Sequence, residues 1–266
     1  MPDYVPRHEL RLTPHPSRST INNEGATIGN DGYPSLDRRQ DSTPKTYLIN
    51  KWLYNFASCF CPTAMTQLAL HPQSKIIRLQ LRQNMVLKNL AAAQWSEFEP
   101  LLEIIDYAKG ETLELQGTHA MEQYFVIDGI LKRAVSNAQG KEMILRFAAE
   151  SDIDTSYAAW RLKTPMPYSI RAVTKVRAAK LSMLQWAAFL ERHIKIKAEF
   201  ELEVMKLMSE VMAHTITLHL LDAPGRVQRF MRKHTELAER LPKKDLASYL
   251  NLSPETLSRL KRRGKI

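Results

Sequence analysis

The feature that most constrains this chain is a regular repeat of seven side chains between positions 200 and 221, six of them apolar. They stand at alternating steps of four and three residues: Phe200, Val204, Leu207, Val211, His214, Leu218 and Leu221. An average step of 3.5 residues is the repeat of helices that pack along each other. At 1.5 Å per residue, a helix over these positions is roughly 33 Å long, enough for a self-association interface. The repeat therefore predicts one long helix and a homodimer joined along these seven side chains.

The same stretch carries a second apolar stripe on another face of the helix. Its members are Leu202, Met205, Met208, Met212 and Ile216. A helix that is apolar on two faces needs two partners, so we expect this stripe to cover the preceding domain. A helix buried within a monomer would show a similar pattern, but the regularity of the first stripe favours the dimer. His214 lies in that first stripe, where a stacked or hydrogen-bonded histidine is expected rather than a metal ligand or pH sensor.

Residues 100–183 have a different period, with short strand-like runs between glycine turns. Apolar and polar residues alternate in LLEIIDYAKGETLELQG, and further β-rich runs are separated at Asp128-Gly129 and at residues 137–140. Asp-Gly between alternating apolar residues is a strong hairpin signal. Several short strands at this spacing predict an antiparallel jelly roll or small barrel.

The first part of the chain lacks any such period. Residues 1 to about 45 are rich in Pro, Ser, Asn, Asp, Gly and Arg, and burial there could not offset the backbone entropy. We expect a disordered extension over residues 1–64. Cys59 and Cys61 are too few for a disulfide framework or a four-cysteine metal site, which favours a reducing cytoplasm. The run YLINKWLYNFASCFC is shorter than the ~20 residues of a membrane helix, so no membrane partner is expected.

The chain ends in a strongly basic segment. Residues 226–266 hold twelve Lys or Arg and four Asp or Glu, which is +8 of the chain's total of +10. The release of counterions from nucleic-acid phosphates exploits such an excess of positive charge. A solvated basic surface would carry the same charge, so the spacing of the residues must decide between the two.

The spacing of this segment predicts a helix-turn-helix. DLASYL places small and apolar residues inward, and Asn251 then tolerates a left-handed turn. Ser253 is a natural N-cap, with Pro254 in the first position of a second helix. On that second helix, Leu257 and Leu260 would pack inward.

The outer face of the second helix carries the side chains expected to contact bases. Glu255, Ser258 and Arg259 stand at positions i, i+3 and i+4. Arg can bind the O6 and N7 atoms of guanine, Glu can accept from cytosine N4, and Ser can take either role. An exposed helix with an internal Glu–Arg pair would explain single residues, but not the whole set. The expected phosphate contacts are Lys243, Lys244, Ser253, Thr256, Lys261, Arg262 and Arg263.

The motifs YAKGETLELQG, YFVIDGILK, GKEMILRF and DLASYLNLSPETLSR together resemble those of the Crp/Fnr family of bacterial transcription regulators, over about residues 85–266. The resemblance implies an α+β chain. An antiparallel β jelly-roll sensor domain of the cyclic-nucleotide-binding type, with flanking helices, would cover residues 65–190. A dimerisation helix would cover residues 191–222, and an all-α helix-turn-helix DNA-binding domain residues 223–266.

The resemblance also implies how such a protein would act. A homodimer would bind double-stranded DNA at two-fold symmetric, TTGAT-like half-sites. In each half-site Arg259 would contact a guanine, Ser258 a thymine, and Glu255 the cytosine of a G·C pair. RNA polymerase and an unidentified small-molecule effector are further partners of such regulators, and no residue of this sequence can be assigned to an effector.

The sequence departs from the family where its cofactors bind. Members that bind a cyclic nucleotide carry a Gly-Glu for the ribose and an Arg-Ser or Arg-Thr for the phosphate, whereas this chain has AAESDIDTSY and Met166-Pro167. Without that arginine a buried phosphate would be unpaired, so no cyclic nucleotide is expected in the usual mode. The four-cysteine set for an iron–sulfur cofactor is also absent. The chain resembles the short members that close soon after SPETLSR without a β-hairpin wing.

Two other classes of protein share parts of this pattern. A metal-dependent oxygenase built on a jelly roll needs several ligands on facing strands, but the β-rich region has only His119, so neither an enzyme nor a metal site is expected. A ligand-binding or protein-interaction scaffold would combine a β-roll and a coiled coil with a basic tail. Its affinity for nucleic acid would be blind to sequence and set entirely by salt.

Overall fold

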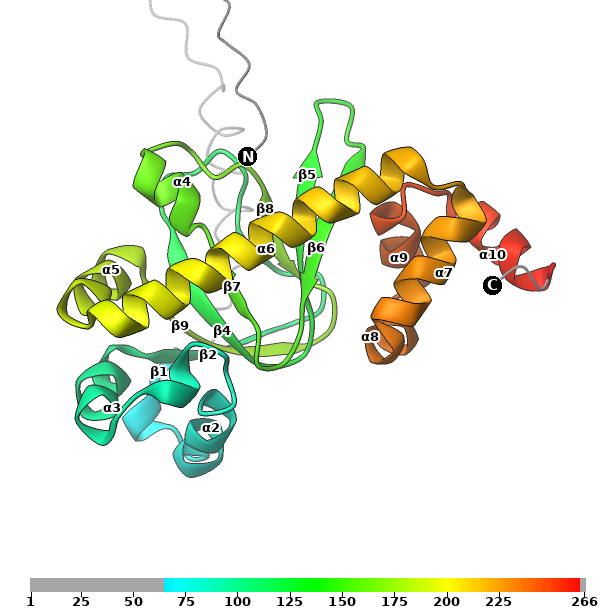
Figure 1. The fold of residues 1–266 in the computed structure, drawn as a ribbon. Helices are drawn as coiled ribbons and strands as arrows, with labels where there is room; N and C mark the ends of the chain where they lie inside the picture. The colour runs from blue at the N-terminus through cyan, green and yellow to red at the C-terminus, as the bar shows by residue number, and fades with distance from the viewer. Residues whose placement is uncertain (1–64, 264–266) are drawn as a thin grey trace, which may run out of the picture. The chain divides into compact units, whose positions relative to one another are not determined.

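The computed structural model describes residues 65–263 and contains two antiparallel sheets (Figure 1). The strands are β1 (Thr66–Gln67), β2 (Glu103–Tyr107), β3 (Thr112–Glu114), β4 (Glu122–Asp128), β5 (Leu131–Ser136), β6 (Glu142–Ala148), β7 (Ile153–Thr155), β8 (Ser169–Ala172) and β9 (Val176–Ser182). One sheet has the order β1-β2-β9-β4-β7 and the other the order β3-β8-β5-β6. The predicted α+β class with an antiparallel β-roll is confirmed.

The two predicted turns have different roles in this β-roll. Residues 137–140 join β5 to β6 as a hairpin, and the Asn137 Oδ1 accepts from two backbone amides of the turn at 3.1 and 2.9 Å. Asp128-Gly129 joins β4 to β5, but these strands lie in different sheets. The hairpin predicted there is therefore wrong, and the dipeptide forms a corner between the sheets. Gly129 has a φ of 91°, and a Cβ would lie 2.1 Å from the Lys175 carbonyl oxygen, so this corner requires glycine.

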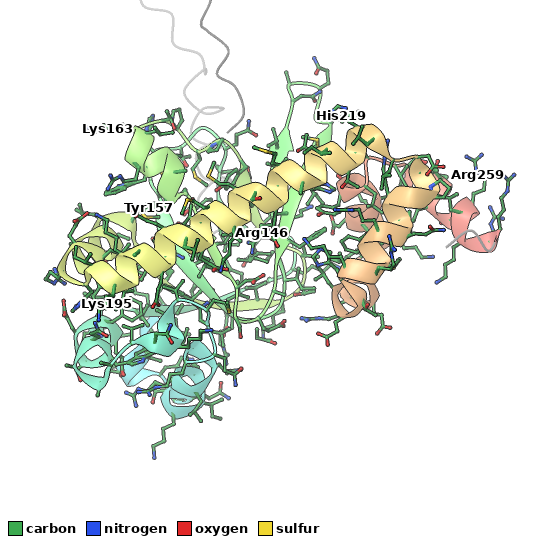
Figure 2. The ribbon with its side chains drawn as sticks, in the orientation of Figure 1. Arg146, Tyr157, Lys163, Lys195, His219 and Arg259 are labelled. Carbon is green, nitrogen blue, oxygen red and sulfur yellow. The ribbon has the colours of Figure 1, made fainter. Side chains whose placement is uncertain are left out.

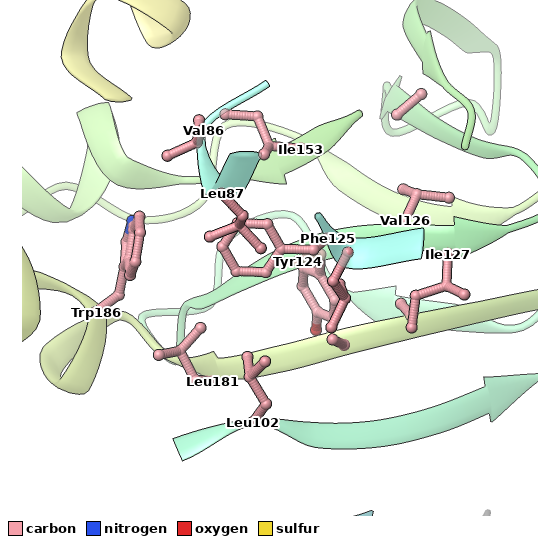
Figure 3. Packing of buried hydrophobic residues seen from close by; sticks show 14 of the residues in the cluster. Val86, Leu87, Leu102, Tyr124, Phe125, Val126, Ile127, Ile153, Leu181 and Trp186 are labelled. Atoms are coloured by element: carbon pink, nitrogen blue, oxygen red, sulfur yellow. The ribbon is translucent and has the colours of Figure 1, made fainter. Parts of the chain in front are cut away.

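Aromatic side chains fill the interior of the β-roll. Phe125 from β4 meets Phe98 and Trp186 edge to face, with ring centroids 5.8 and 5.6 Å apart. Figure 3 shows Trp186, Phe125 and Leu181 in the same interior. Trp186 and Phe125 are fully buried, and aromatic pairs in this geometry stabilise a core beyond their area alone. One continuous hydrophobic core therefore joins the five-stranded sheet to its flanking helices.

Short helices flank this core on either side of the strands. They are η1 (Leu68–Leu70), α2 (Ser74–Leu81), η2 (Leu87–Asn89), α3 (Ala92–Phe98), η3 (Glu99–Leu101), α4 (Tyr157–Leu162) and α5 (Met183–Arg192). The start of α5 is fixed by a capping box: the Ser182 hydroxyl accepts from the Gln185 amide, and the Gln185 side chain accepts from the Ser182 amide, both at 3.3 Å. This cap directs Trp186 and Phe189 into the core.

Helix α6 (Ile194–Leu220) is the long helix that the repeat predicts. Phe200, Val204 and Leu207 are 0%, 9% and 6% exposed and belong to the core of the β-roll of the same chain. The assignment of these three side chains to a dimer interface is therefore wrong. The opposite expectation for the second stripe is wrong as well. Its side chains do not cover the β-roll and are exposed by half or more: Leu202, Met205, Met208, Met212 and Ile216.

The C-terminal half of the first stripe is buried less than its N-terminal half. Val211 and Leu218 are half-buried, and Leu221 is exposed just beyond the helix. His214 stacks on Tyr249, with ring centroids 3.7 Å apart, and its Nε2 is 3.0 Å from the Tyr249 carbonyl oxygen. The predicted stacked and hydrogen-bonded histidine is thus confirmed, but its partner lies within the chain.

Four helices follow α6, and we refer to them as the C-terminal helices. They are α7 (Ala223–Lys233), α8 (Thr235–Arg240), α9 (Lys243–Tyr249) and α10 (Pro254–Arg262). The segment Asp222-Ala-Pro-Gly225 starts α7, because the Asp222 carboxylate accepts from the Gly225 amide at 2.9 Å. Pro224 is tolerated because it stands in the first turn.

Two sequence expectations lie outside the described residues. These are the disordered extension over residues 1–64 and any role of Cys59 and Cys61. Within residues 65–263 no helix is both long and apolar enough to cross a membrane.

Candidate nucleic-acid interface

Helices α9 and α10 form the predicted helix-turn-helix. The connection turns at Asn251, whose φ of 52° is left-handed, and the Leu252 amide returns to the Ala247 carbonyl oxygen at 2.9 Å. The Ser253 hydroxyl then accepts from the Thr256 amide at 3.1 Å and caps α10. Asn and Ser are among the residue types that make these two geometries favourable. The direction of α10 is thus set by local hydrogen bonds as well as by packing.

Small and apolar side chains hold the two helices together. Ala247 is fully buried, and its small size lets the helices approach each other. Leu246 and Leu250 from α9 pack in one cluster with Leu257 and Leu260 from α10. Because these positions face inward, the opposite side of α10 is free to face a partner.

That opposite side carries the three side chains predicted to contact bases. Glu255 and Arg259 are exposed and Ser258 is half-buried. Figure 2 shows Arg259 on α10, directed away from the other C-terminal helices. Hydrogen bonding lowers the pKa of the Glu255 carboxyl, first through its own backbone amide and then through Ser253, so it is an acceptor at neutral pH. Acceptor and donor groups therefore stand side by side near the start of this helix.

The predicted phosphate contacts lie around this face. Lys243 and Lys244 are exposed at the start of α9. Lys261, Arg262 and Arg263 are exposed at the end of α10. Ser253 and Thr256 bond to each other within the cap, with their hydroxyl oxygens 3.1 Å apart.

Sequence reasoning missed the contact between α9 and the β-roll. The Lys132 ammonium on β5 bonds to the carboxylates of Asp245 on α9, at 2.8 Å, and Glu142 on β6, at 2.7 Å. The Ser248 hydroxyl donates to the Glu142 carbonyl oxygen at 3.0 Å. The only sign of this contact in the sequence was Asp245, an acidic residue within a basic segment. Its partner Lys132, and the Glu142 that Ser248 contacts, each lie more than 100 residues earlier in the chain.

The interior of the β-roll holds a buried ion pair. The Arg133 Nε is 2.8 Å from Asp154 Oδ1, and both side chains are almost fully buried. The same guanidinium donates to the Thr155 carbonyl oxygen at 3.1 Å and lies 4.7 Å from the Tyr168 ring centroid. A charge pair in a low-dielectric interior requires such additional bonds to offset its desolvation.

A second carboxyl in this region is also buried. Glu114 is 7% exposed, and its Oε1 accepts from the Glu122 amide at 2.8 Å. Burial, together with the nearby charges of Asp154 and Glu122, raises the pKa of Glu114 to about 8. This part of the β-roll is therefore rich in acidic groups.

These residues do not fit a cyclic nucleotide held in the family's usual way. Asp154 lies in the stretch that corresponds to the ribose contacts, and Met166, 1% exposed, stands where the phosphate-binding arginine would be. A thioether offers no positive charge, and a nearby carboxylate repels a phosphate. Among residues 65–263, no three His, Cys, Asp or Glu side chains gather into a group that could hold a metal ion.

Comparisons with known proteins agree with this architecture. Residues 104–193 match the family model of the cyclic nucleotide-binding domain. The nitrogen fixation regulation protein FixK of Bradyrhizobium diazoefficiens is 23% identical over 201 residues, which are 70% of this chain and 83% of that protein.

Solved structures share the same fold. The c-di-GMP responsive global regulator CLP of Xanthomonas campestris has a TM-score of 0.56 at 16% identity, covering 65% of this chain and 92% of that one. A transcriptional regulator of the Crp/Fnr family from Eubacterium rectale has a TM-score of 0.55 at 15% identity, covering 68% and 87%.

The fold and the domain match define a protein with a β-roll of the cyclic-nucleotide-binding type, a long helix and a helix-turn-helix. The chain thus carries a cyclic nucleotide-binding domain and is similar to the regulator FixK.

Proposed function

We propose that this protein is a sequence-specific, DNA-binding transcription regulator and not an enzyme. The observation that carries the proposal is the capped helix α10, which turns Leu257 and Leu260 inward and leaves Glu255 and Arg259 exposed. Exposed basic residues flank this face at both ends. Groups near the N-terminus of such a helix contact bases, while the flanking Lys and Arg contact phosphates. The spacing of Glu255, Ser258 and Arg259 favours TTGAT-like half-sites.

Selection of bound fragments from random DNA tests this function. The wild-type protein is expected to enrich a two-fold symmetric motif. Arg259→Ala should lose about 1–3 kcal/mol of binding free energy at one base pair and relax the motif there. Arg262→Ala is the matched control on the same helix, and it should weaken all sequences alike. If no motif is enriched, or both variants keep the wild-type motif and affinity, the chain is not a sequence-specific regulator.

We further propose that the protein acts as a homodimer through the exposed stripe of α6. Leu202, Met205, Met212 and Ile216 stand at helical spacing on one face, with Met208 at its edge, and are 50–66% exposed. A surface helix rarely leaves such a continuous apolar face in water, because burying it is favourable. A two-fold axis along this stripe would present two α10 helices, which must lie ~34–36 Å apart to enter successive major grooves.

Sedimentation equilibrium tests the proposed dimer. Met212→Glu places a charge in the middle of the stripe and should give a monomer that binds palindromic DNA at least 10-fold more weakly. Thr215→Glu is the control, since it adds the same charge at an exposed position of the same turn but beside the stripe. A dimer that survives Met212→Glu would place the interface elsewhere.

We also propose that no cyclic nucleotide controls this regulator through the usual contacts. The support is the chemistry of the β-roll interior, where the buried Met166 offers no positive charge and the Asp154 carboxylate already pairs with Arg133. Titration calorimetry with cyclic AMP and cyclic GMP should show no saturable binding. Tight binding of either nucleotide would refute the proposal.

A further inference from the structure

A cavity of about 650 Å³ lies between α6, β6 and the C-terminal helices. Its size falls within the ~300–1,000 Å³ that is typical of sites for small molecules. One wall is aromatic and consists of Phe230, Tyr249 and the His214 ring stacked on Tyr249. The cavity is therefore large enough, and rigid enough on one side, to hold a ligand.

Basic side chains reach this cavity from several elements. Helix α7 presents Arg226, Arg229 and Lys233 at i, i+3 and i+7, so all three lie on one side of the helix. Strand β6 adds Arg146, which Figure 2 shows beside the middle of α6, and α8 adds Arg240. The guanidinium of Arg229 has no hydrogen-bond or ion-pair partner within residues 65–263. Arg226 donates to main-chain oxygens, those of Leu221 at 2.9 Å and Leu250 at 3.2 Å.

The acidic side chains that line the cavity are mostly neutralised by the chain itself. The pairs are Glu150–Arg240 at 2.5 Å, Asp152–Arg146 at 3.3 Å, Glu203–Lys206 at 2.9 Å and Glu210–Lys233 at 3.5 Å. The last pair is longer than an ordinary charged hydrogen bond, so Lys233 can turn toward a ligand. Glu236 also lines the cavity and is in none of these pairs. Once the pairs are set aside, two arginines, Arg229 and Arg226, therefore remain against one carboxylate.

The basic side chains also act on the two histidines of the cavity wall. Burial lowers the pKa of His214, and the charges of His234 and Lys233 lower it further. Burial likewise lowers the pKa of His234, with Lys233 and Arg146 adding to the effect, although Glu210 opposes it. Two groups on the cavity wall thus experience the basic side chains that surround them. A bound anion would experience the same charges as an attraction, strengthened by the partial exclusion of water.

We propose that this cavity is a binding site for a small, multiply charged anion. Arg229 and Lys233 hold its charged groups, and the wall formed by Tyr249 and Phe230 contacts its remainder. Arginine is suited to this task because its planar guanidinium donates two parallel hydrogen bonds to a phosphate or carboxylate. The cavity adjoins the buried Arg133–Asp154 pair through Arg146, whose Nη1 lies 3.7 Å from Asp154 Oδ2, and the site does not depend on the proposed binding of DNA.

Titration calorimetry with inorganic pyrophosphate, at an ionic strength held constant with sodium chloride, tests the site. The full-length wild-type protein should bind one pyrophosphate per chain in a saturable manner. The double variant Arg229→Gln/Lys233→Gln should bind at least 10-fold more weakly. The double variant Lys109→Gln/Lys195→Gln removes the same charge at exposed positions outside the cavity and should bind like the wild type.

Two further arms complete the experiment. Arg259→Gln, which alters the exposed face of α10, should leave pyrophosphate affinity unchanged, so that binding at the nucleic-acid interface is told apart from binding in the cavity. Citrate in place of pyrophosphate distinguishes a carboxylate ligand from a phosphate ligand, and binding of either one at this site supports the proposal. The proposal is overturned if neither anion binds the wild type, or if Arg229→Gln/Lys233→Gln binds both as tightly as the wild type does. Unchanged circular dichroism of the double variant would confirm that it folds.

Discussion

The β-roll and the C-terminal helices form their cores in different ways. The β-roll encloses its large side chains, such as Phe125 and Trp186, between its own sheets and flanking helices. The C-terminal helices are 6 to 11 residues long, and their leucines share one cluster with Ile130, Ala134 and Ile144 from the β-rich region. Short helices bury too little apolar surface to be stable alone. The comparison teaches that the proposed DNA-binding region depends on the β-roll for part of its core.

The largest effect on stability should come from the core of the β-roll. Trp186→Ala removes a fully buried indole that packs against Phe98, Phe125 and Phe200. We expect a loss of about 3–5 kcal/mol in the free energy of unfolding, measured with urea. Leu184→Ala on the same helix is the control, since Leu184 is 72% exposed and should change stability by no more than about 0.5 kcal/mol.

The buried carboxyl of Glu114 should make the β-roll sensitive to pH. Its folded pKa of about 8 exceeds its ordinary value of 4.5, so the folded state holds the proton more tightly than the unfolded state. The stability that depends on this proton is complete below pH 4.5 and is lost as the pH rises toward 8. Glu114→Gln should therefore flatten the pH profile of urea unfolding and gain about 4 kcal/mol at pH 8. Equal slopes for wild type and variant would contradict the assignment.

Added side-chain volume should destabilise the cluster that the C-terminal helices share with the β-roll. Ala247→Leu inserts three carbon atoms where α9 approaches both α10 and β6. We expect a loss of about 1–3 kcal/mol, with the C-terminal helices unfolding before the β-roll. Hydrogen exchange followed by mass spectrometry would locate the loss. Ala93→Leu at an exposed position of α3 is the matched control and should leave the exchange pattern unchanged.

The smallest effect should come from the exposed ion pair that links the two regions. Arg240 on α8 contacts Glu150, which follows β6, and their side chains are 42% and 33% exposed. Arg240→Gln should cost no more than about 1 kcal/mol, and the cost should vanish at high salt. A larger loss in the urea transition would show that this pair, rather than the shared apolar cluster, holds the regions together.

Much of the local structure could be predicted because it depends on neighbouring residues. The 3.5-residue repeat indicated α6, and Ser253 and Pro254 indicated the start of α10. The hairpin at residues 137–140 follows from its turn residues. In each case the hydrogen bonds that fix the element lie within a few positions of one another.

Tertiary contacts explain what the sequence could not show. The spacing of apolar residues places two apolar stripes on α6 but does not show which of them faces the β-roll. The stripe with Phe200 does so because the Phe200 ring packs against Trp186 and Tyr157. Asp128-Gly129 has the composition of a hairpin, but the approach of the Lys175 carbonyl makes it a corner. The cavity beside Arg229 is formed by residues far apart in the sequence, so no single motif reveals it.

The burial of α6 has a mechanical consequence. The helix has 27 residues, so it is about 40 Å long, and its fully buried apolar side chains end at Leu207. Beyond Leu207, α6 continues past the core of the β-roll and leads to the C-terminal helices, so Leu207 marks the point about which this part of the helix could tilt. The stretch from Leu207 to Leu220 spans about 20 Å, so a tilt of about 10° at Leu207 moves the end of α6 by about 3.5 Å, close to the 3.4 Å between successive bases along one DNA strand. Such a tilt would shift α10 by one base step and would require the cluster shared by the C-terminal helices and the β-roll to repack.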